Sequence, residues 1–251
     1  MKKYIISVSL IILVLLAADF AYFHLGIYFV SHDDNLVDFF IKTEGKEIYM
    51  IEDGKEIPFE IRGVNMGSGE PGEWSTNFSI DKETYKRWFS YIQEMGANTL
   101  RVYTSQNDTF YNAFYEYNKD RSEPLYLIHG VWVNDYVQNS HLDAYSTEFY
   151  ETFKQDCKIM VDVIHGKRKI NLGRVGSAGH GTYRKDISRW VIGYILGVEW
   201  EDLTVAYTDD LYQGIDGYTS YNGKYMYTKE GASPFEVMLA RVGDAVIEYE
   251  T

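Results

Sequence analysis

The chain has 251 residues, a net charge of −13 and an aromatic content of 16%, with 23 Tyr and 5 Trp. The negative charge argues against nucleic acid as a partner, because phosphate binding requires a basic surface. The lone Cys157 excludes an intrachain disulfide, and because it lies in a helical pattern we expect it to be a small core residue. Tyr and Trp rings stack on flat, hydroxylated ligands while their polar groups form hydrogen bonds, so the composition favours sugars as ligands.

The N-terminus predicts a membrane segment. Lys2 and Lys3 precede an apolar run from Tyr4 to about Val30, which is long enough to span a bilayer. Its clean core, Ile5–Ala18, has the length of a signal peptide. We favour an uncleaved signal anchor, with the lysine pair in the cytoplasm and the rest of the chain on the extracytoplasmic face. Cleavage would instead give a secreted protein.

The remaining residues divide into a linker at 31–47 and one domain at 48–251. The domain opens with a small β-ribbon, in which Ile48–Ile51 and Ile57–Phe59 flank a turn sequence. The pattern then predicts alternating elements: a strand at Phe59–Met66, a helix between the N-cap Asp81 and Gly96, a strand at Asn98–Thr104, a helix at Asp108–Asn118, a strand at Pro124–Val133, a helix at Ser146–His165, a strand within Trp190–Trp200 and a helix at Phe235–Tyr249. Residues 166–186 and 203–234 are predicted to be loops.

This alternation predicts an α/β fold made of four right-handed βα units around a parallel sheet. In such folds, ligands bind where the carboxyl ends of the strands meet. Glu199 follows the last strand, between Val198 and Trp200. We expect this carboxyl group to be poorly solvated, which favours the protonated form that a general acid needs. The alternative is that Glu199 pairs with an arginine or caps the next loop.

The segments FEIRGVNM, EMGANTLRVYT and LYLIHGVWVND, together with the strand that ends in Glu199, resemble the first half of a (β/α)8-barrel glycoside hydrolase. The similar proteins form the retaining clan of β-galactosidase-type and cellulase-type enzymes. The resemblance extends from about Phe59 to the C-terminus. It implies a TIM-barrel-like partial barrel in which Glu199 is the acid/base and Arg101 positions the nucleophile.

Two departures from the clan weaken the case for a complete enzyme. Val198 occupies the position where the clan has an Asn that contacts the sugar 2-hydroxyl. The clan nucleophile ends a seventh strand, which this chain does not reach, although a retaining mechanism needs two carboxyl groups about 5–5.5 Å apart. Three explanations stay open: a truncated enzyme, a half-barrel that associates with its own copy or another chain, and a protein that binds carbohydrate without catalysis.

Further polar and aromatic residues are predicted to contact substrate from the loops after the strands. They are Asn65, Glu70, Glu73, Trp74, His129, Trp132, Asp135 and Trp200. The acidic loop residues are equally consistent with a solvated loop, and a Trp after a strand with a core residue. The histidines lack metal-ligand spacing, so no metal or organic cofactor is expected. The sequence thus predicts a glycoside hydrolase-like protein acting on cell-surface or extracellular oligo- or polysaccharide. The alternative is a non-catalytic carbohydrate-binding or polysaccharide assembly subunit in the membrane.

Overall fold

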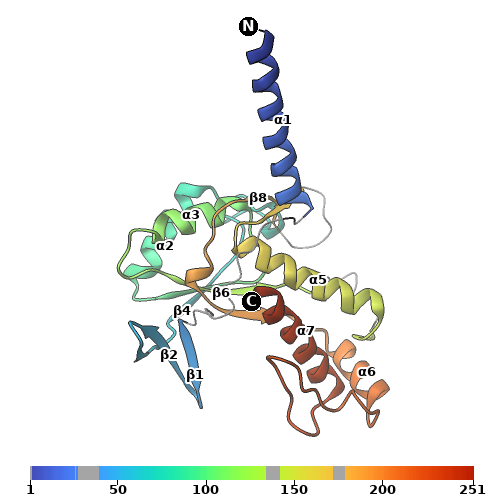
Figure 1. The fold of residues 1–251 in the computed structure, drawn as a ribbon. Helices are drawn as coiled ribbons and strands as arrows, with labels where there is room; N and C mark the ends of the chain where they lie inside the picture. The colour runs from blue at the N-terminus through green and yellow to red at the C-terminus, as the bar shows by residue number, and fades with distance from the viewer. Residues whose placement is uncertain (1, 26, 28–39, 134–141, 172–178) are drawn as a thin grey trace.

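The computed structural model describes residues 2–25, 27, 40–133, 142–171 and 179–251 (Figure 1). Its helices are α1 (Lys2–His24), α2 (Lys82–Glu94), α3 (Asp108–Asn118), α5 (Thr147–Ile164), α6 (Asp202–Tyr212) and α7 (Pro234–Glu250), with short 3-10 turns η1 (Ser75–Asn77) and η2 (Ser188–Trp190). Its strands are β1 (Ile41–Glu44), β2 (Glu47–Glu52), β3 (Lys55–Pro58), β4 (Gly63–Met66), β5 (Thr99–Val102), β6 (Tyr126–Val131), β7 (Arg168–Ile170), β8 (Gly181–Tyr183) and β9 (Val191–Leu196).

Strands β4, β5, β6 and β9 form a parallel sheet in chain order, which confirms the predicted α/β class and its parallel sheet. Within the described residues β4 and β9 each pair with one neighbour only, so the sheet is open. This order is the one that successive βα units of a barrel would give, but it is also that of any singly wound sheet. The partial barrel therefore remains an interpretation.

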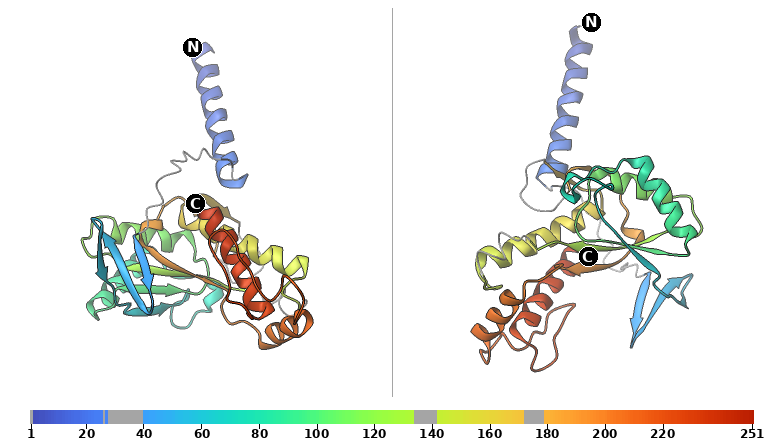
Figure 2. Two further views of the ribbon diagram at one scale, coloured as in Figure 1. Left: turned by 60° about the horizontal axis from the view of Figure 1, so that its bottom comes forward. Right: turned by 180° about the vertical axis from the view of Figure 1, so that it is seen from behind.

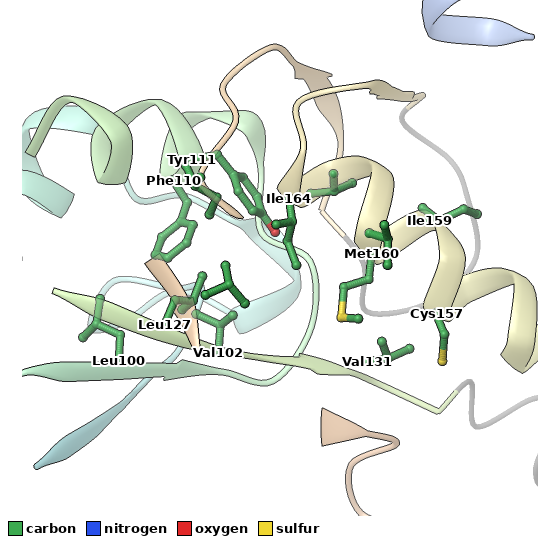
Figure 3. Close-up of a cluster of buried hydrophobic side chains, with 14 of the residues drawn as sticks. Leu100, Val102, Phe110, Tyr111, Leu127, Val131, Cys157, Ile159, Met160 and Ile164 are labelled. Carbon is green, nitrogen blue, oxygen red and sulfur yellow. The ribbon is translucent and has the colours of Figure 1, made fainter. Parts of the chain in front are cut away.

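The core lies between the sheet and the layer formed by α2, α3 and α5, as Figure 1 and the side chains in Figure 3 show. Leu100, Val102 and Leu127 project from the strands into this layer and are almost fully buried. They meet an aromatic cluster in which the rings of Phe89 and Phe110 lie 5.8 Å apart, edge to face. Burial of several such side chains, at about 1.5–3 kcal/mol each, stabilises the sheet against the helices.

Local signals placed most element ends correctly. The Asp81 side chain accepts a hydrogen bond from the Thr84 amide at 2.7 Å, as the predicted N-cap should. Cys157 is fully buried in α5, which confirms its prediction as a core residue. Ser233 is the N-cap of helix α7 and forms a reciprocal capping box with Glu236.

Four short elements, β1, β7, β8 and α6, appear where loops or a linker were predicted. Strand β1 lies inside the predicted linker and completes a three-stranded antiparallel ribbon with β2 and β3. Strands β7 and β8 form an antiparallel hairpin within predicted loop 166–186. Helix α6 begins at Asp202, one residue before predicted loop 203–234, lies in that loop for the rest of its length and contacts α7. In Figure 2 the β1–β3 ribbon and the α6–α7 pair lie toward opposite ends of the parallel sheet.

Helix α1 projects away from the rest of the protein (Figure 1), and its large apolar side chains from Tyr4 to Phe20 are exposed, whereas Phe23 is buried. The stretch Lys3–Phe23 has 21 residues and is long and apolar enough to cross a membrane. A membrane anchor and a signal sequence both have these properties.

Candidate functional site

The chain bends sharply after β9. Gly197 has a φ of 82°, a value that favours glycine, and the indole of Trp200 lies directly against its α-carbon. The Trp200 Nε1 donates a hydrogen bond to the carbonyl oxygen of Leu196 at 3.3 Å, which closes the bend. Glu199, within the bend, has the left-handed φ of 55°, uncommon for a residue with a side chain. This strained turn holds Glu199 at the carboxyl end of the sheet.

A pocket of about 320 Å³ lies where the carboxyl ends of the four parallel strands meet. Each strand is followed by at least one residue that lines it. The lining residues are Met66, Gly67, Ser68, Ser75, Thr76, Tyr103, Thr104, Gln106, Trp132 and Glu199. This volume falls at the lower end of the range for ligand pockets, about 300–1,000 Å³.

Glu199 is the one carboxylate among the described residues that line this pocket. Its side chain is exposed, although its neighbour Val198 is buried and Trp200 is half-buried. The burial expected for Glu199 from the apolar sequence around it is therefore not found. The reason is the turn geometry, because the left-handed backbone directs this one side chain outward.

Gln106 is the most unusual polar residue of the pocket wall. It is only 2% exposed, and its Nε2 donates to the carbonyl oxygen of Thr104 at 3.1 Å. Its Oε1 is buried and has no hydrogen-bond partner among the described residues. An unsatisfied buried acceptor costs about 1–3 kcal/mol, so a ligand hydroxyl that reached this oxygen through a small shift of the pocket wall would relieve that penalty.

The backbone around Gln106 is fixed from two sides. The Tyr183 hydroxyl in β8 donates to the Gln106 carbonyl oxygen at 2.7 Å, and the Gln106 amide donates to the Tyr111 hydroxyl at 3.3 Å. The Gly179 amide also donates to the Ser105 carbonyl oxygen at 2.6 Å. These bonds hold the side chain in place without satisfying its Oε1.

The loop after β4 contributes a further part of the pocket wall, including Ser68, Ser75 and Thr76. The Ser68 hydroxyl donates to the Ser75 carbonyl oxygen at 2.6 Å and so closes this loop on itself. Glu70, Glu73 and Trp74, which were predicted to contact substrate, belong to the loop but do not line the pocket. Glu73 accepts a hydrogen bond from Asn77 at 2.8 Å, and Trp74 is 80% exposed.

Arg101 and Asn65 lie side by side in the β4–β5 register, on the sheet face that is turned away from the buried Leu100 and Val102. The Arg101 guanidinium lies 4.6 Å from the ring centroid of Tyr103, which lines the pocket. Its Nε is buried without a hydrogen-bond partner among the described residues. Arg101 therefore borders the pocket through Tyr103 rather than lining it.

Two predicted contact residues have structural roles instead. His129 is fully buried on the helix side of β6, where its Nε2 lies 2.7 Å from the Tyr111 hydroxyl and its Nδ1 lies 3.0 Å from the Gly130 carbonyl oxygen. Burial lowers the pKa of His129 to about 4, so its ring is neutral at physiological pH. Trp200 packs on Phe153 and Phe235, with ring centroids 5.0 and 4.9 Å away.

Of the predicted residues, the structure thus brings Glu199 and Trp132 into the pocket. Asp135 lies outside the described residues. Sequence reasoning missed Gln106 and Ser68, which each follow a predicted strand by two residues, and Tyr103, which lies at the end of one. Their position after strands β4 and β5 was the available signal, since side chains there converge at one end of a parallel sheet.

No protein family, curated protein or solved structure matches the chain. Function must therefore be inferred from the pocket itself. The pocket offers a half-buried indole, a phenol ring, hydroxyl groups, an unpaired amide oxygen and one exposed carboxylate. Such a set can stack on an apolar ligand face and accept hydrogen bonds from ligand hydroxyl groups.

Proposed function

We propose that this protein is a membrane-associated carbohydrate-binding protein whose binding site is the pocket at the carboxyl ends of β4, β5, β6 and β9. The observation that carries the proposal is the buried, unpaired Oε1 of Gln106 in a wall that also contains Trp132 and Tyr103. A sugar has both the hydroxyl donors that this oxygen lacks and the flat C–H face that aromatic rings bind.

The Glu199 carboxylate supports the same assignment. It adds a second acceptor for hydroxyl groups, while Ser75 and Thr76 supply hydroxyls that donate or accept. A phosphorylated or carboxylated ligand is disfavoured, because no Lys or Arg is among the described residues that line the pocket. The ligand class that best matches this wall is therefore a neutral saccharide.

A second candidate function is retaining glycoside hydrolysis, with Glu199 as the acid/base. Its support is the position of Glu199 after the fourth strand, within the pocket, which matches the clan that the sequence resembles. The mechanism needs a second carboxyl group about 5–5.5 Å away. No other described carboxylate lines the pocket, so the nucleophile would have to come from a further segment or from an associated chain.

Binding can be tested on the full chain in a detergent without a sugar head group, since alkyl glycosides would compete. Neutral oligosaccharides are titrated against tryptophan fluorescence or followed by saturation-transfer NMR. Gln106→Met keeps the side-chain volume but removes the acceptor, and we expect it to weaken binding about tenfold, the loss of about 1.4 kcal/mol. Trp132→Ala should weaken binding further by removing the stacking surface.

Tyr227→Ala is the matched control, because Tyr227 is an exposed aromatic residue that does not line the pocket. Equal affinity of wild type and Gln106→Met for every sugar that binds would refute the proposed site. Release of reducing sugar by wild type, abolished in Glu199→Gln, would select the hydrolase over the binding protein. Binding without release would select the binding protein.

A further inference from the structure

Basic residues are concentrated in one segment of this acidic chain. Residues 167–189 contain seven Lys or Arg and a single acidic residue, Asp186, in a chain whose net charge is −13. The basic residues are Lys167, Arg168, Lys169, Arg174, Arg184, Lys185 and Arg189. Arg174 lies outside the described residues and is not used below. A local excess of positive charge attracts anionic surfaces, although the negative charge of the rest of the protein repels them.

The β7–β8 hairpin displays this charge on its outer side. Lys169, paired with Thr182 in the hairpin register, is exposed, as are Arg184 and Arg189. Arg168 is turned inward instead and lies 3.3 Å from the buried Asp162. The single carboxylate of the segment, Asp186, is engaged by His165 and Ser188. Little of the outward positive charge is therefore neutralised within the segment.

The hairpin also holds the C-terminal end of α1. Helix α1 contacts β7, and the Arg184 guanidinium lies 2.9 Å from the Asp19 carboxylate. The same guanidinium lies 4.2 Å from the ring centroid of Phe23, which is 7% exposed. Figure 1 shows β8 below the lower end of α1, with the β1–β3 ribbon on the opposite side of the protein.

The length of α1 fixes the depth of this contact relative to a bilayer. At about 1.5 Å per residue, the 21 residues of Lys3–Phe23 span about 31 Å, which matches a hydrocarbon core of about 30 Å. Phe23 then lies at one boundary of the core, and Asp19 lies about one turn inside it. Since Arg184 reaches Asp19, the hairpin must lie at the level of the lipid head groups, where Arg and Lys direct their charges toward water and phosphate.

Two apolar residues at the same end agree with this placement. Leu25 and Ile27, which follow α1, are 59% and 62% exposed. Apolar side chains left in water at the end of a spanning helix are stabilised if they enter the interfacial region. Apolar and basic groups thus meet at one end of the protein, next to the place where α1 leaves the bilayer.

We propose that the β7–β8 hairpin and the turn through Arg189 form a lipid-binding surface that contacts anionic phospholipid head groups beside α1. The surface would hold the domain against the membrane at a fixed orientation. Its tether is the Asp19–Arg184 pair, and its attraction comes from Lys169 and Arg189. The inference does not depend on what the pocket binds, because none of these residues lines it.

The test uses the full chain with Asn171→Cys, labelled with a fluorophore and reconstituted in vesicles. Asn171 is exposed at the end of β7, whereas the native Cys157 is fully buried and should stay unlabelled. Quenching by acrylamide, which is neutral, is compared between pure phosphatidylcholine and a mixture with one third phosphatidylglycerol. We expect quenching to fall at least about twofold in the anionic vesicles and to recover in 1 M salt, where the Debye length is only about 3 Å.

Charge reversal distinguishes the effect of this surface from the effect of the net charge of the protein. The pair Lys169→Glu and Arg189→Glu should abolish the protection, while Lys55→Glu and Lys229→Glu make the same change at exposed sites elsewhere and should retain it. Three results would overturn the proposal. They are equal quenching in neutral and anionic vesicles, an equal loss of protection from quenching in the control pair of substitutions, and failure of the wild-type protein to float with neutral vesicles. The salt titration of the labelled Asn171→Cys protein needs no charge reversal, so its result does not depend on whether the paired variants fold.

Discussion

His165 joins three parts of the fold that are distant in sequence. It caps the C-terminus of α5, its Nδ1 lies 3.4 Å from Asp186 before η2, and its Nε2 lies 3.0 Å from Glu250 in the last turn of α7. Burial opposes a charge on the ring, but the two carboxylates outweigh it and raise the pKa of His165 to about 9. The protonated ring is therefore the form that stabilises the fold.

The size and sign of this contribution follow from linkage. A rise in pKa from 6.5 to about 9 corresponds to at most about 3.4 kcal/mol, at about 1.36 kcal/mol per unit. The pKa of Asp186 moves less, because burial opposes its charge while His165 and Ser188 lower it from 3.8 to about 2. Its side chain is 56% exposed, so solvent screens the pair and we expect a contribution of about 1–2 kcal/mol.

Because the folded-state pKa is the higher one, the stabilisation is fully present below about pH 6.5 and is lost as the pH rises through about 9. The measurement is the free energy of unfolding by denaturant between pH 6 and pH 10, for the full chain in detergent. The difference in free energy of unfolding between wild type and His165→Gln, taken at each pH, separates the contribution of His165 from that of other titrating groups. His180→Gln serves as the matched control, and parallel profiles for wild type and His165→Gln would refute the reasoning.

Two further substitutions probe the bend after β9 and the loop before α7. Gly197→Ala should lower the free energy of unfolding by about 2–4 kcal/mol, because it combines a positive φ with a clash against Trp200. The control is Gly193→Ala, whose new methyl group has no neighbour within 4 Å and should change the free energy of unfolding by under about 1 kcal/mol. Similar melting curves for both variants would contradict this prediction. Asp244→Ala should speed amide hydrogen exchange at residues 224–226 while α5 stays protected, because its carboxylate accepts backbone hydrogen bonds from this segment, including that of Tyr225 at 2.6 Å. Unchanged exchange there would show that the loop is held by other contacts.

The sequence by itself determined the elements whose signals are local. An N-cap is decided by one short side chain and the amides of the next turn, so Asp81 identified the start of α2 without knowledge of the fold. The spacing of apolar residues gave α5 and the burial of Cys157, because a helix turns the same face to the core every three or four residues. Alternation of strand and helix likewise gave the parallel sheet.

Short elements without an apolar period escaped the same reasoning. Strands β7 and β8 have three residues each, and they are held by one another and by contacts to the turn before α3, such as that of Tyr183 with Gln106. The prediction of a loop at 166–186 therefore missed the two short strands that this segment contains. Contacts between segments more than 70 residues apart leave no periodic pattern in either segment.

The site itself was decided mainly by tertiary structure. The sequence placed Glu199 and Trp132 near the strand ends, but it could not tell that His129 faces the helices, since a strand residue changes face with a shift of one position. Nor could it tell that the bend at Gly197 leaves Glu199 exposed, or that Gln106 is buried with an unpaired oxygen. Local propensity fixes which element a residue joins, whereas its exposure and partners depend on which other segments pack against it.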